Sequence, residues 1–351
     1  MNNTKLVSVG GVKLGGGESV KIQSMTTTKT ADVEKTAAQI NALEKAGCEI
    51  VRVAVSDEAD ALAVKEVVSK IKLPLVADIH FSPKLAVMAI ENGAHKVRIN
   101  PGNIGGEKEI KYVADCVKAH GIPVRVGANT GSIEKNFLEK YGKNEYSLVE
   151  SALYNVGILE KFGVNDIVVS VKASSVPLTV KAYTLLAQRT DYPLHVGVTE
   201  AGTTEAGIVK SAVGIGSLLL NGIGDTIRVS LTDDPVKEID AAKLILRSCG
   251  LDEAFVEVVS CPTCGRCAWA SMALAEKVTA FVKPYKKRAK IAVMGCVVNG
   301  PGEARDADIG IAGGNGSCLL FKKGEPYKKV DAENAEAEFF KEIRSLLDEQ
   351  S

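Results

Sequence analysis

Between residues 20 and 250 the chain alternates eight times between a short β-rich run and an amphipathic helical stretch. This alternation predicts repeated βα units and a parallel sheet. Several runs are nearly continuously apolar, which is typical of strands buried on both faces. Eight units over about 230 residues predict an α/β fold of the (β/α)8 TIM-barrel type, with an open doubly wound sheet as the alternative. Strands are expected at residues 20–25, 49–55, 75–80, 96–100, 124–128, 167–172, 194–199 and 226–231.

Capping residues mark boundaries between these units. Ser82 and Pro83 predict an N-cap followed by proline at the first helical position, and Gly93 is expected to close that helix. Two segments depart from the repeat. The stretch 130–163 is long enough for an extra helix or an active-site loop, and residues 5–15 are expected to form a small hairpin at the bottom of the barrel.

The repeat stops after residue 250, which predicts a barrel domain at 1–250 and a smaller second domain at 251–351. Helical and β-rich segments mix in this second domain, so an α+β architecture is expected. Its expected elements are a strand at 255–259, a helix at 268–281, a strand at 290–294, a glycine-rich segment at 312–316 and a polar terminal helix at 332–349.

Overall charge and hydropathy restrict the possible partners. The chain has 43 Lys+Arg against 43 Asp+Glu and is 46% hydrophobic, so it has a globular composition without the basic surface of a nucleic-acid-binding protein. The N-terminal residues do not resemble a signal peptide, and no apolar run approaches the ~18 residues of a membrane span. We therefore expect a cytoplasmic protein that binds neither nucleic acid nor membranes.

Five of the expected strands carry a basic residue inside an apolar run. A buried cation without a counter-ion is prohibitively costly, so each needs a carboxylate from the chain or an anion from outside. Because barrel active sites lie where these residues fall, at the C-terminal strand ends, we favour a phosphate or diphosphate ligand. Alternatives are a salt-bridge network with Asp78 and Glu200, or a Schiff-base role for Lys172. The basic residues are Arg52, Arg98, Arg125, Lys172 and Arg228.

Further polar residues follow the same strand ends. Asp78 and His80 are two positions apart, so in extended backbone they point to one face. Each such residue taken singly is equally consistent with a strand cap or turn, but their convergence at one rim indicates a site. The others are Gln23, Ser24, Asn100, Asn129, Glu200, Ser230 and Thr232.

A cysteine constellation in the second domain indicates metal chemistry. Cys261 and Cys264 form a C-x-x-C pair, and Cys296 follows after 31 intervening residues. Structural zinc usually takes four Cys or His ligands, and this domain has no histidine. Three soft thiolates suit an iron–sulfur cluster that leaves one iron to a different ligand. Glu303 is the candidate, because Asn-Gly-Pro-Gly predicts a turn that returns it to Cys296.

Five motifs together carry a family resemblance. The chain resembles the family of 4-hydroxy-3-methylbut-2-enyl diphosphate synthases in their bacterial two-domain form, from about residue 20 to residue 316. The motifs are CPTCGR at 261–266, GCVVNGPGE at 295–303, ADIHF at 77–81, VRINPGN at 97–103 and VTEAG at 198–202.

This resemblance implies a TIM barrel joined to a reductase-like domain with a 4Fe-4S cluster. The implied substrate is 2-C-methyl-D-erythritol 2,4-cyclodiphosphate, opened reductively with two electrons and loss of water. The implied cluster ligands are Cys261, Cys264, Cys296 and Glu303. The implied diphosphate-binding residues are Arg52, Arg98, Arg125, Asn129, Lys172, Arg228 and Ser230.

The implied chemistry also assigns acids and partners. Glu200 is the candidate proton donor or orienting carboxylate, supported by His80 and Asp78. A cluster of this kind needs a flavodoxin or ferredoxin as reductant, and the family implies a head-to-tail homodimer. Cys267 departs from the family pattern and is interpreted as a bystander. Two alternatives are a pterin-synthase-type barrel with a structural zinc module, and a non-enzymatic electron carrier fused to a ligand-binding barrel.

Overall fold

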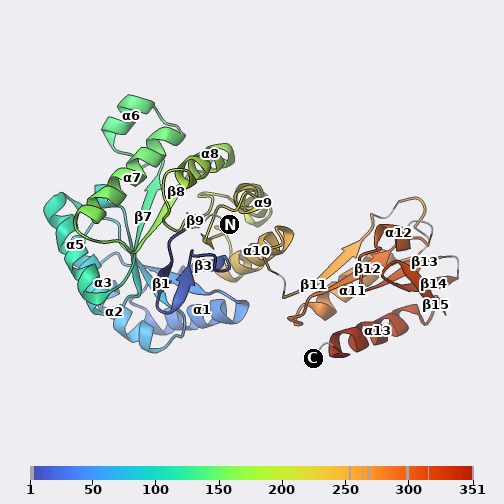
Figure 1. The fold of residues 1–351 in the computed structure, drawn as a ribbon. Coiled ribbons are helices and arrows are strands. Elements are labelled where there is room, and N and C mark those ends of the chain that lie inside the picture. The colour runs from blue at the N-terminus through green and yellow to red at the C-terminus, as the bar shows by residue number, and fades with distance from the viewer. Residues whose placement is uncertain are drawn as a thin grey trace. The chain divides into compact units, whose positions relative to one another are not determined.

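The computed structural model describes residues 4–252, 254–262, 264–267, 269–297, 300–314 and 316–349, except for the side chains of residues 101, 102 and 349. The chain divides into two compact units, Met1–Leu251 and Asp252–Ser351 (Figure 1).

The first unit is a parallel barrel surrounded by helices (Figure 1). Its strands are β3 (Lys21–Met25), β4 (Ile50–Ala54), β5 (Leu75–Asp78), β6 (Lys96–Ile99), β7 (Val124–Asn129), β8 (Ile167–Lys172), β9 (His195–Val196) and β10 (Thr226–Ile227). They pair in the order β8-β7-β6-β5-β4-β3-β10-β9, and a parallel bridge between Val169 and Leu194 nearly closes the ring. The expected TIM barrel is confirmed, and the open doubly wound sheet is wrong.

Strands β9 and β10 are shorter than the runs expected at 194–199 and 226–231. The backbone N–H of Arg228 still donates to the carbonyl of Val196 at 2.9 Å, which extends the pairing by one step. Beyond it the chain turns into loops, where the N–H of Thr232 donates to the carbonyl of Gly202 at 3.1 Å. The C-terminal residues of both runs therefore belong to the barrel rim.

The helices of this unit follow the expected capping signals. They are α1 (Val33–Ala46), α2 (Glu58–Ser69), α3 (Pro83–Glu91), α4 (Pro101–Ile104), α5 (Glu107–His120), α6 (Lys135–Tyr141), α7 (Glu145–Lys161), α8 (Val176–Ala187), α9 (Thr204–Leu220) and α10 (Pro235–Ser248). The Ser82 hydroxyl accepts from the N–H of Leu85 at 3.3 Å, so it caps α3 as predicted. Helix α3 ends slightly before Gly93, whose φ of 95° is left-handed. The segment 130–163 contains two helices, α6 and α7.

An antiparallel hairpin closes the end of the barrel at which the strands begin. Its strands are β1 (Val7–Val9) and β2 (Val12–Leu14), as expected from the sequence. Apolar side chains of the hairpin pack against the first residues of barrel strands, so the hairpin covers the lower core. The packed residues are Val7, Val9, Leu14, Ile50, Val76 and Val168.

The second unit is an α+β domain, as predicted. Its elements are β11 (Val256–Ser260), α11 (Ser271–Val282), β12 (Ala289–Met294), α12 (Gly300–Glu303), β13 (Ile309–Gly313), β14 (Ser317–Lys322), β15 (Glu325–Asp331) and α13 (Ala335–Glu349). The five strands pair in chain order, first parallel and then antiparallel from β13 onward. The sequence analysis missed β13, β14 and β15. Left-handed Gly316 and Gly324 permit the tight turns that join them.

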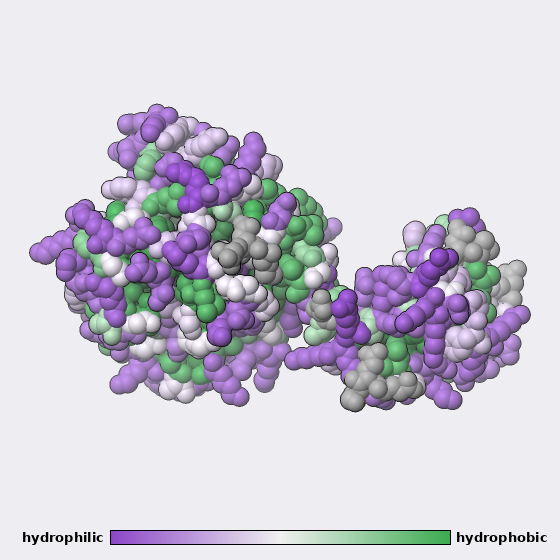
Figure 2. All heavy atoms as spheres, in the orientation of Figure 1, coloured by the Kyte–Doolittle hydropathy of each residue, from purple (hydrophilic) through white to green (hydrophobic). Residues whose placement is uncertain are grey.

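The sheet of the second unit has a separate core on each face. Helices α11 and α13 supply Leu274, Val278 and Phe339 to the larger core. On the other face Phe321 and Ala304 belong to a smaller core, which lies beside α12. The outer surfaces seen in Figure 2 are largely hydrophilic, interrupted by separate apolar patches.

Candidate active site

The barrel strands bring the five predicted basic residues together, but not all of them at C-terminal strand ends as expected, because Arg125 is the second residue of β7. Arg52, Arg98 and Arg125 lie in β4, β6 and β7, Lys172 ends β8, and Arg228 directly follows β10. Arg98 and Arg125 occupy neighbouring register positions, so their side chains leave the sheet on the same face. We call these five residues the cationic cluster.

Most of the cationic cluster is removed from water. Arg125 is 1% exposed, and burial together with Arg52 and Arg98 lowers the pKa of its guanidinium. Burial and the surrounding arginines also lower the pKa of Lys172 well below its usual value. Burial lowers the pKa of Arg52 to about 10. The lowered pKa values indicate that these basic groups are dehydrated and repel one another.

Asp78 is a counter-ion within this cluster. Its Oδ1 accepts from Arg98 Nη1 at 3.0 Å, and its Oδ2 lies 3.5 Å from Arg52 Nε. Burial raises the pKa of Asp78, but Arg52, Arg98 and Arg125 together outweigh it and hold the pKa at about 2. His80 Nε2 lies 3.7 Å from Asp78 Oδ2, and the imidazole is largely exposed. The alternative of an internal salt bridge with Asp78 therefore applies to part of the cluster.

The second counter-ion is Glu238, which the sequence analysis missed. Its Oε1 lies 3.5 Å from Arg228 Nη2, and its Oε2 accepts from the Ser24 hydroxyl at 2.9 Å. Glu238 is only 4% exposed although it lies in the first turn of α10. An acidic residue in a first helical turn is ordinary, so the sequence carried no signal for its burial.

The two carboxylates leave part of the cluster unpaired. Among the residues that the structure describes, Arg125 Nε and Nη1 and Arg228 Nε have no hydrogen-bond partner. The ion pairs of Asp78 and Glu238 reach Arg52, Arg98 and Arg228, and no such pair among the described residues reaches Arg125 or Lys172. Unsatisfied buried donors of this kind are costly unless an anion or water occupies the site.

Two glycines give the basic side chains room. A Cβ at Gly197 would lie 2.7 Å from Lys172 Nζ and 2.6 Å from the carbonyl oxygen of Arg228. A Cβ at Gly127 would lie 2.9 Å from Arg98 Nε. Side chains at these positions would displace the cations, so the missing Cβ atoms are part of the site geometry.

The remaining predicted residues line the rim to different degrees. Asn129 ends β7 in register with Lys172, and it is half-buried. Ser230 is half-buried in the loop after β10. Glu200 is exposed and has a left-handed φ of 53°, which is uncommon for a residue other than glycine.

In the second unit, two cysteines meet at the turn that precedes Cys296. Cys261 Sγ accepts from the N–H of Gly295 at 3.0 Å. A Cβ at Gly295 would lie 3.0 Å from Cys267 Sγ and 3.3 Å from Cys261 Sγ, so both sulfurs face this glycine. The sequence analysis did not foresee this position of Cys267.

The other residues expected to bind the iron–sulfur cluster differ in their exposure. Cys264 is exposed, and hydrogen bonds from the backbone and side chain of Arg266 lower the pKa of its thiol. Cys296 is half-buried, and Glu303 is exposed at the end of α12. Asn299 of the expected turn lies outside the described residues. Within the described part of the chain, no three His, Cys, Asp or Glu side chains converge as a metal site.

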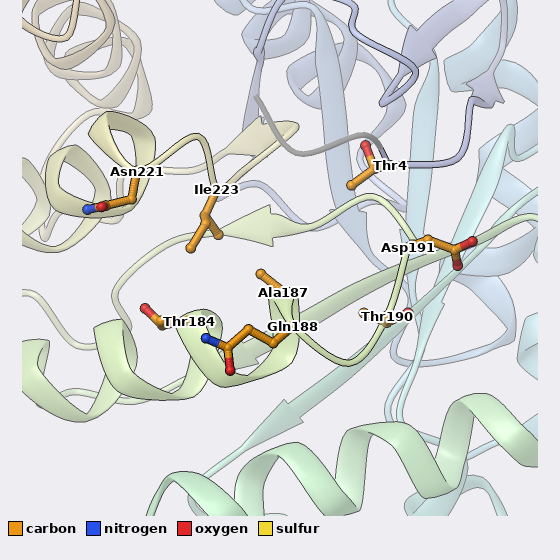
Figure 3. Close-up of a pocket in the computed structure, with 8 residues that line it drawn as sticks. All are labelled: Thr4, Thr184, Ala187, Gln188, Thr190, Asp191, Asn221 and Ile223. Atoms are coloured by element: carbon orange, nitrogen blue, oxygen red, sulfur yellow. The ribbon is translucent and has the colours of Figure 1, made fainter.

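The barrel unit also has a pocket of about 610 Å³ near the beginnings of its strands (Figure 3), and no residue of the cationic cluster lines it. Thr184 and Gln188 reach it from α8, and Ile223 lies in the loop before β10. Asp191, also at this pocket, pairs with Lys5 at 3.0 Å. The pocket lacks the basic side chains expected of a diphosphate site among its lining residues.

The fold and the cationic cluster define a class of protein: a (β/α)8-barrel protein with buried basic side chains in its barrel, whose chain continues into a cysteine-bearing α+β unit. The chain belongs to the family of 4-hydroxy-3-methylbut-2-en-1-yl diphosphate synthases. It matches the GcpE TIM-barrel domain over residues 4–243 and the GcpE protein C-terminal domain over residues 257–345. The resemblance inferred from the five motifs is confirmed.

Two curated relatives show the extent of the match. The 4-hydroxy-3-methylbut-2-en-1-yl diphosphate synthase (flavodoxin) of Caldanaerobacter subterraneus subsp. tengcongensis is 55% identical over 348 residues, covering 99% of this chain and 98% of the relative. The protein of the same name from Fusobacterium nucleatum subsp. nucleatum is 53% identical, covering 99% and 97%.

Solved structures show the barrel fold alone. Dihydropteroate synthase from Xanthomonas albilineans has a TM-score of 0.50 and 13% identity, covering 70% of this chain and 98% of that chain. N-acetylneuraminic acid synthetase from Leptospira borgpetersenii serovar Hardjo-bovis has the same TM-score and identity, covering 80% and 98%. The pterin-synthase alternative therefore shares the barrel architecture, whereas the family match covers both units of the chain.

No helix among the described residues is both long and apolar enough to cross a bilayer.

Proposed function

We propose that the cationic cluster binds the diphosphate of 2-C-methyl-D-erythritol 2,4-cyclodiphosphate for its reductive ring opening. The chain is an oxidoreductase of isoprenoid biosynthesis that forms 4-hydroxy-3-methylbut-2-enyl diphosphate, the activity for which its relatives are named. Two electrons and two protons enter, a ring C–O bond breaks to release the phosphate oxygen, and the hydroxyl that is lost leaves as water.

The observation that carries the binding proposal is the unpaired part of the cluster. Arg125 has free guanidinium donors, and the described counter-ions of the cluster are Asp78 and Glu238. A diphosphate supplies several anionic oxygens that accept hydrogen bonds in the fork geometry of arginine. We assign Asn129 and Ser230 as further donors at the rim because both are half-buried beside the cluster.

The same cations assist the bond cleavage. Negative charge builds on the phosphate oxygen as the ring opens, and fixed guanidinium groups in a dehydrated site stabilise that charge. Asp78, with its pKa of about 2, stays ionised and positions Arg98 rather than donating a proton. Glu200 and His80 are exposed at the rim, and we assign the proton-donating or orienting role to Glu200 with His80 in support.

The second unit has a donor set that fits an iron–sulfur cluster. Thiols are the ligands that such clusters prefer, and Cys261 already accepts a backbone N–H bond of the kind that tunes cluster sulfurs. We propose Cys261, Cys264, Cys296 and Glu303 as the ligands of a 4Fe-4S cluster. When bound, the cluster supplies electrons one at a time to the substrate.

A cluster that turns over needs an external reductant. The relatives carry "flavodoxin" in their names, and we propose a flavodoxin or ferredoxin as the donor for this chain. A head-to-tail homodimer and a cytoplasmic location stay predictions from the family resemblance and the sequence.

Arg125→Met tests the binding site. This change removes a buried cation without leaving a carboxylate unpaired, so we expect a stable protein that binds the cyclodiphosphate at least 10-fold more weakly, measured by anaerobic calorimetry without reductant. Arg189→Met, on the outer surface beside Glu150, is the matched control and should bind like the wild type. Unchanged affinity in Arg125→Met contradicts the proposed site.

Anaerobic Mössbauer and EPR spectroscopy test the cluster. We expect a 4Fe-4S signal in which one iron changes when the cyclodiphosphate is added. A colourless protein with stoichiometric zinc would instead support the structural-zinc alternative.

A further inference from the structure

Met25 occupies a central position in the cationic cluster that the proposed function does not use. It ends β3, which lies between β4 and β10 in the barrel. Arg52 is its register partner in β4, and Arg228 follows β10 on the other side. The side chain at the end of β3 therefore stands between two cations.

The Met25 thioether contacts both guanidinium groups. Arg52 donates to Met25 Sδ from Nε at 3.1 Å and from Nη2 at 2.9 Å. Arg228 donates to the same sulfur from Nη1 at 3.7 Å, within the longer range of bonds to sulfur. One neutral atom thus accepts from both arginines.

Each of these two arginines also lies near a carboxylate. Asp78 Oδ2 is 3.5 Å from Arg52 Nε, and Glu238 Oε1 is 3.5 Å from Arg228 Nη2. Each guanidinium therefore lies near both a carboxylate and the shared sulfur, and Arg52 Nε is close to both of its partners. A thioether is a weak acceptor without charge, so it orients the donors and cancels none of their positive charge.

We propose that Met25 is a positioning residue for the diphosphate, whose sulfur holds Arg52 and Arg228 in their binding orientation while leaving their charge to the substrate. This inference rests on the proposed function of the cationic cluster. A carboxylate at position 25 would orient the same donors but would compete with the anion.

Three variants separate an acceptor role from a packing role. Met25→Leu keeps the volume and removes the acceptor, Met25→Gln keeps a neutral acceptor, and Met25→Glu adds charge. For the cyclodiphosphate we expect about 3- to 10-fold weaker binding in Met25→Leu, binding within about 2-fold of wild type in Met25→Gln, and more than 10-fold weaker binding in Met25→Glu.

The measurement is anaerobic calorimetry on the full-length holoprotein without reductant, paired with steady-state kinetics. The loss in Met25→Leu should appear in KM with kcat largely retained. If Met25 acts only through packing, the order of affinities reverses: Met25→Leu would bind the cyclodiphosphate like the wild type, and Met25→Gln would bind it more weakly. That result overturns the inference. If Met25→Leu does not fold, Met25→Gln decides alone: retained affinity supports the inference and a loss above 10-fold overturns it.

Arg125→Met separates a failure of the proposed diphosphate site from a failure of the role proposed for Met25. If it binds the cyclodiphosphate normally, the proposed site itself fails. If it loses binding while Met25→Leu does not, the site stands and only the role of Met25 fails.

Discussion

Buried basic side chains in the barrel carry a desolvation cost that Asp78 and Glu238 offset only in part. Lys172 and Arg125 are nearly inaccessible, and burial lowers the pKa of each. Sites selected for binding commonly reduce the stability of the free protein. Substitutions that remove these cations are therefore expected to weaken ligand binding and to raise the free energy of unfolding.

Lys172→Met tests this opposition. Because burial lowers the pKa of Lys172, the unfolded chain binds this proton more readily than the folded one, and removing the group should raise the free energy of unfolding by about 1 kcal/mol near neutral pH. Thermal unfolding without ligand measures this. Addition of the cyclodiphosphate should raise the Tm of the wild type and leave that of the variant nearly unchanged. A destabilised variant that keeps the ligand-induced shift contradicts the prediction.

Binding should also be linked to protons through Lys172. In the free protein its pKa lies well below 10.5, and an anion beside it favours the ammonium form. At pH values above the lowered pKa, binding therefore takes up a proton, and affinity falls as the pH rises past that pKa. Calorimetry in buffers of different ionisation enthalpy measures this uptake. The contribution should vanish in Lys172→Met, and an equal uptake in that variant would assign the proton to another group.

At the scale of elements, Gly127 in β7 and Gly197 directly after β9 leave room for the basic side chains, because neither residue has a Cβ. Gly197→Ala places a Cβ against the Arg228 carbonyl and the Lys172 ammonium. We expect at least 10-fold weaker cyclodiphosphate binding, because backbone and cation both have to move. Gly131→Ala is the control, since no described atom lies within 4 Å of its added Cβ. Normal affinity in Gly197→Ala, measured by calorimetry, would show that the rim adapts.

The elements themselves differ in how much of them local sequence predicted. Apolar runs and capping signals predicted the barrel strands, the cap of α3 and the hairpin β1–β2, because these depend on neighbouring residues. The strands β14 and β15 were missed because neither shows a clear alternation of buried and exposed residues. All but the last residue of β14 is buried or half-buried, whereas β15 is exposed along most of its length and carries Lys328 and Lys329. Strands β9 and β10 are short because the chain beyond them stops pairing with the neighbouring strand and forms loops at the barrel rim.

At the scale of the whole molecule, the proposed mechanism uses the cysteines of the second unit as well as the barrel. Cys267 Sγ lies near the same glycine as Cys261 Sγ, although we assign it no ligand role. Cys267→Ser should retain the iron and sulfide content of the wild type, and Cys261→Ser should lose both. Chemical analysis and Mössbauer spectra of anaerobically purified protein provide the measurement. Loss of iron in Cys267→Ser would make Cys267 a ligand and put the assignment of Glu303 in doubt.

The sequence by itself determined the barrel, the two-part organisation and the family, because hydrophobic periodicity and short motifs are local properties of a chain. It also identified the basic residues, since a cation within an apolar strand is conspicuous. Only the tertiary structure decided their partners. Met25 meets Arg228 across a long sequence separation, Glu238 reaches it from the first turn of α10, and Asp78 became a counter-ion through the register of adjacent strands. Charge pairing depends on distances of a few ångströms, which the folded barrel sets and local sequence does not encode.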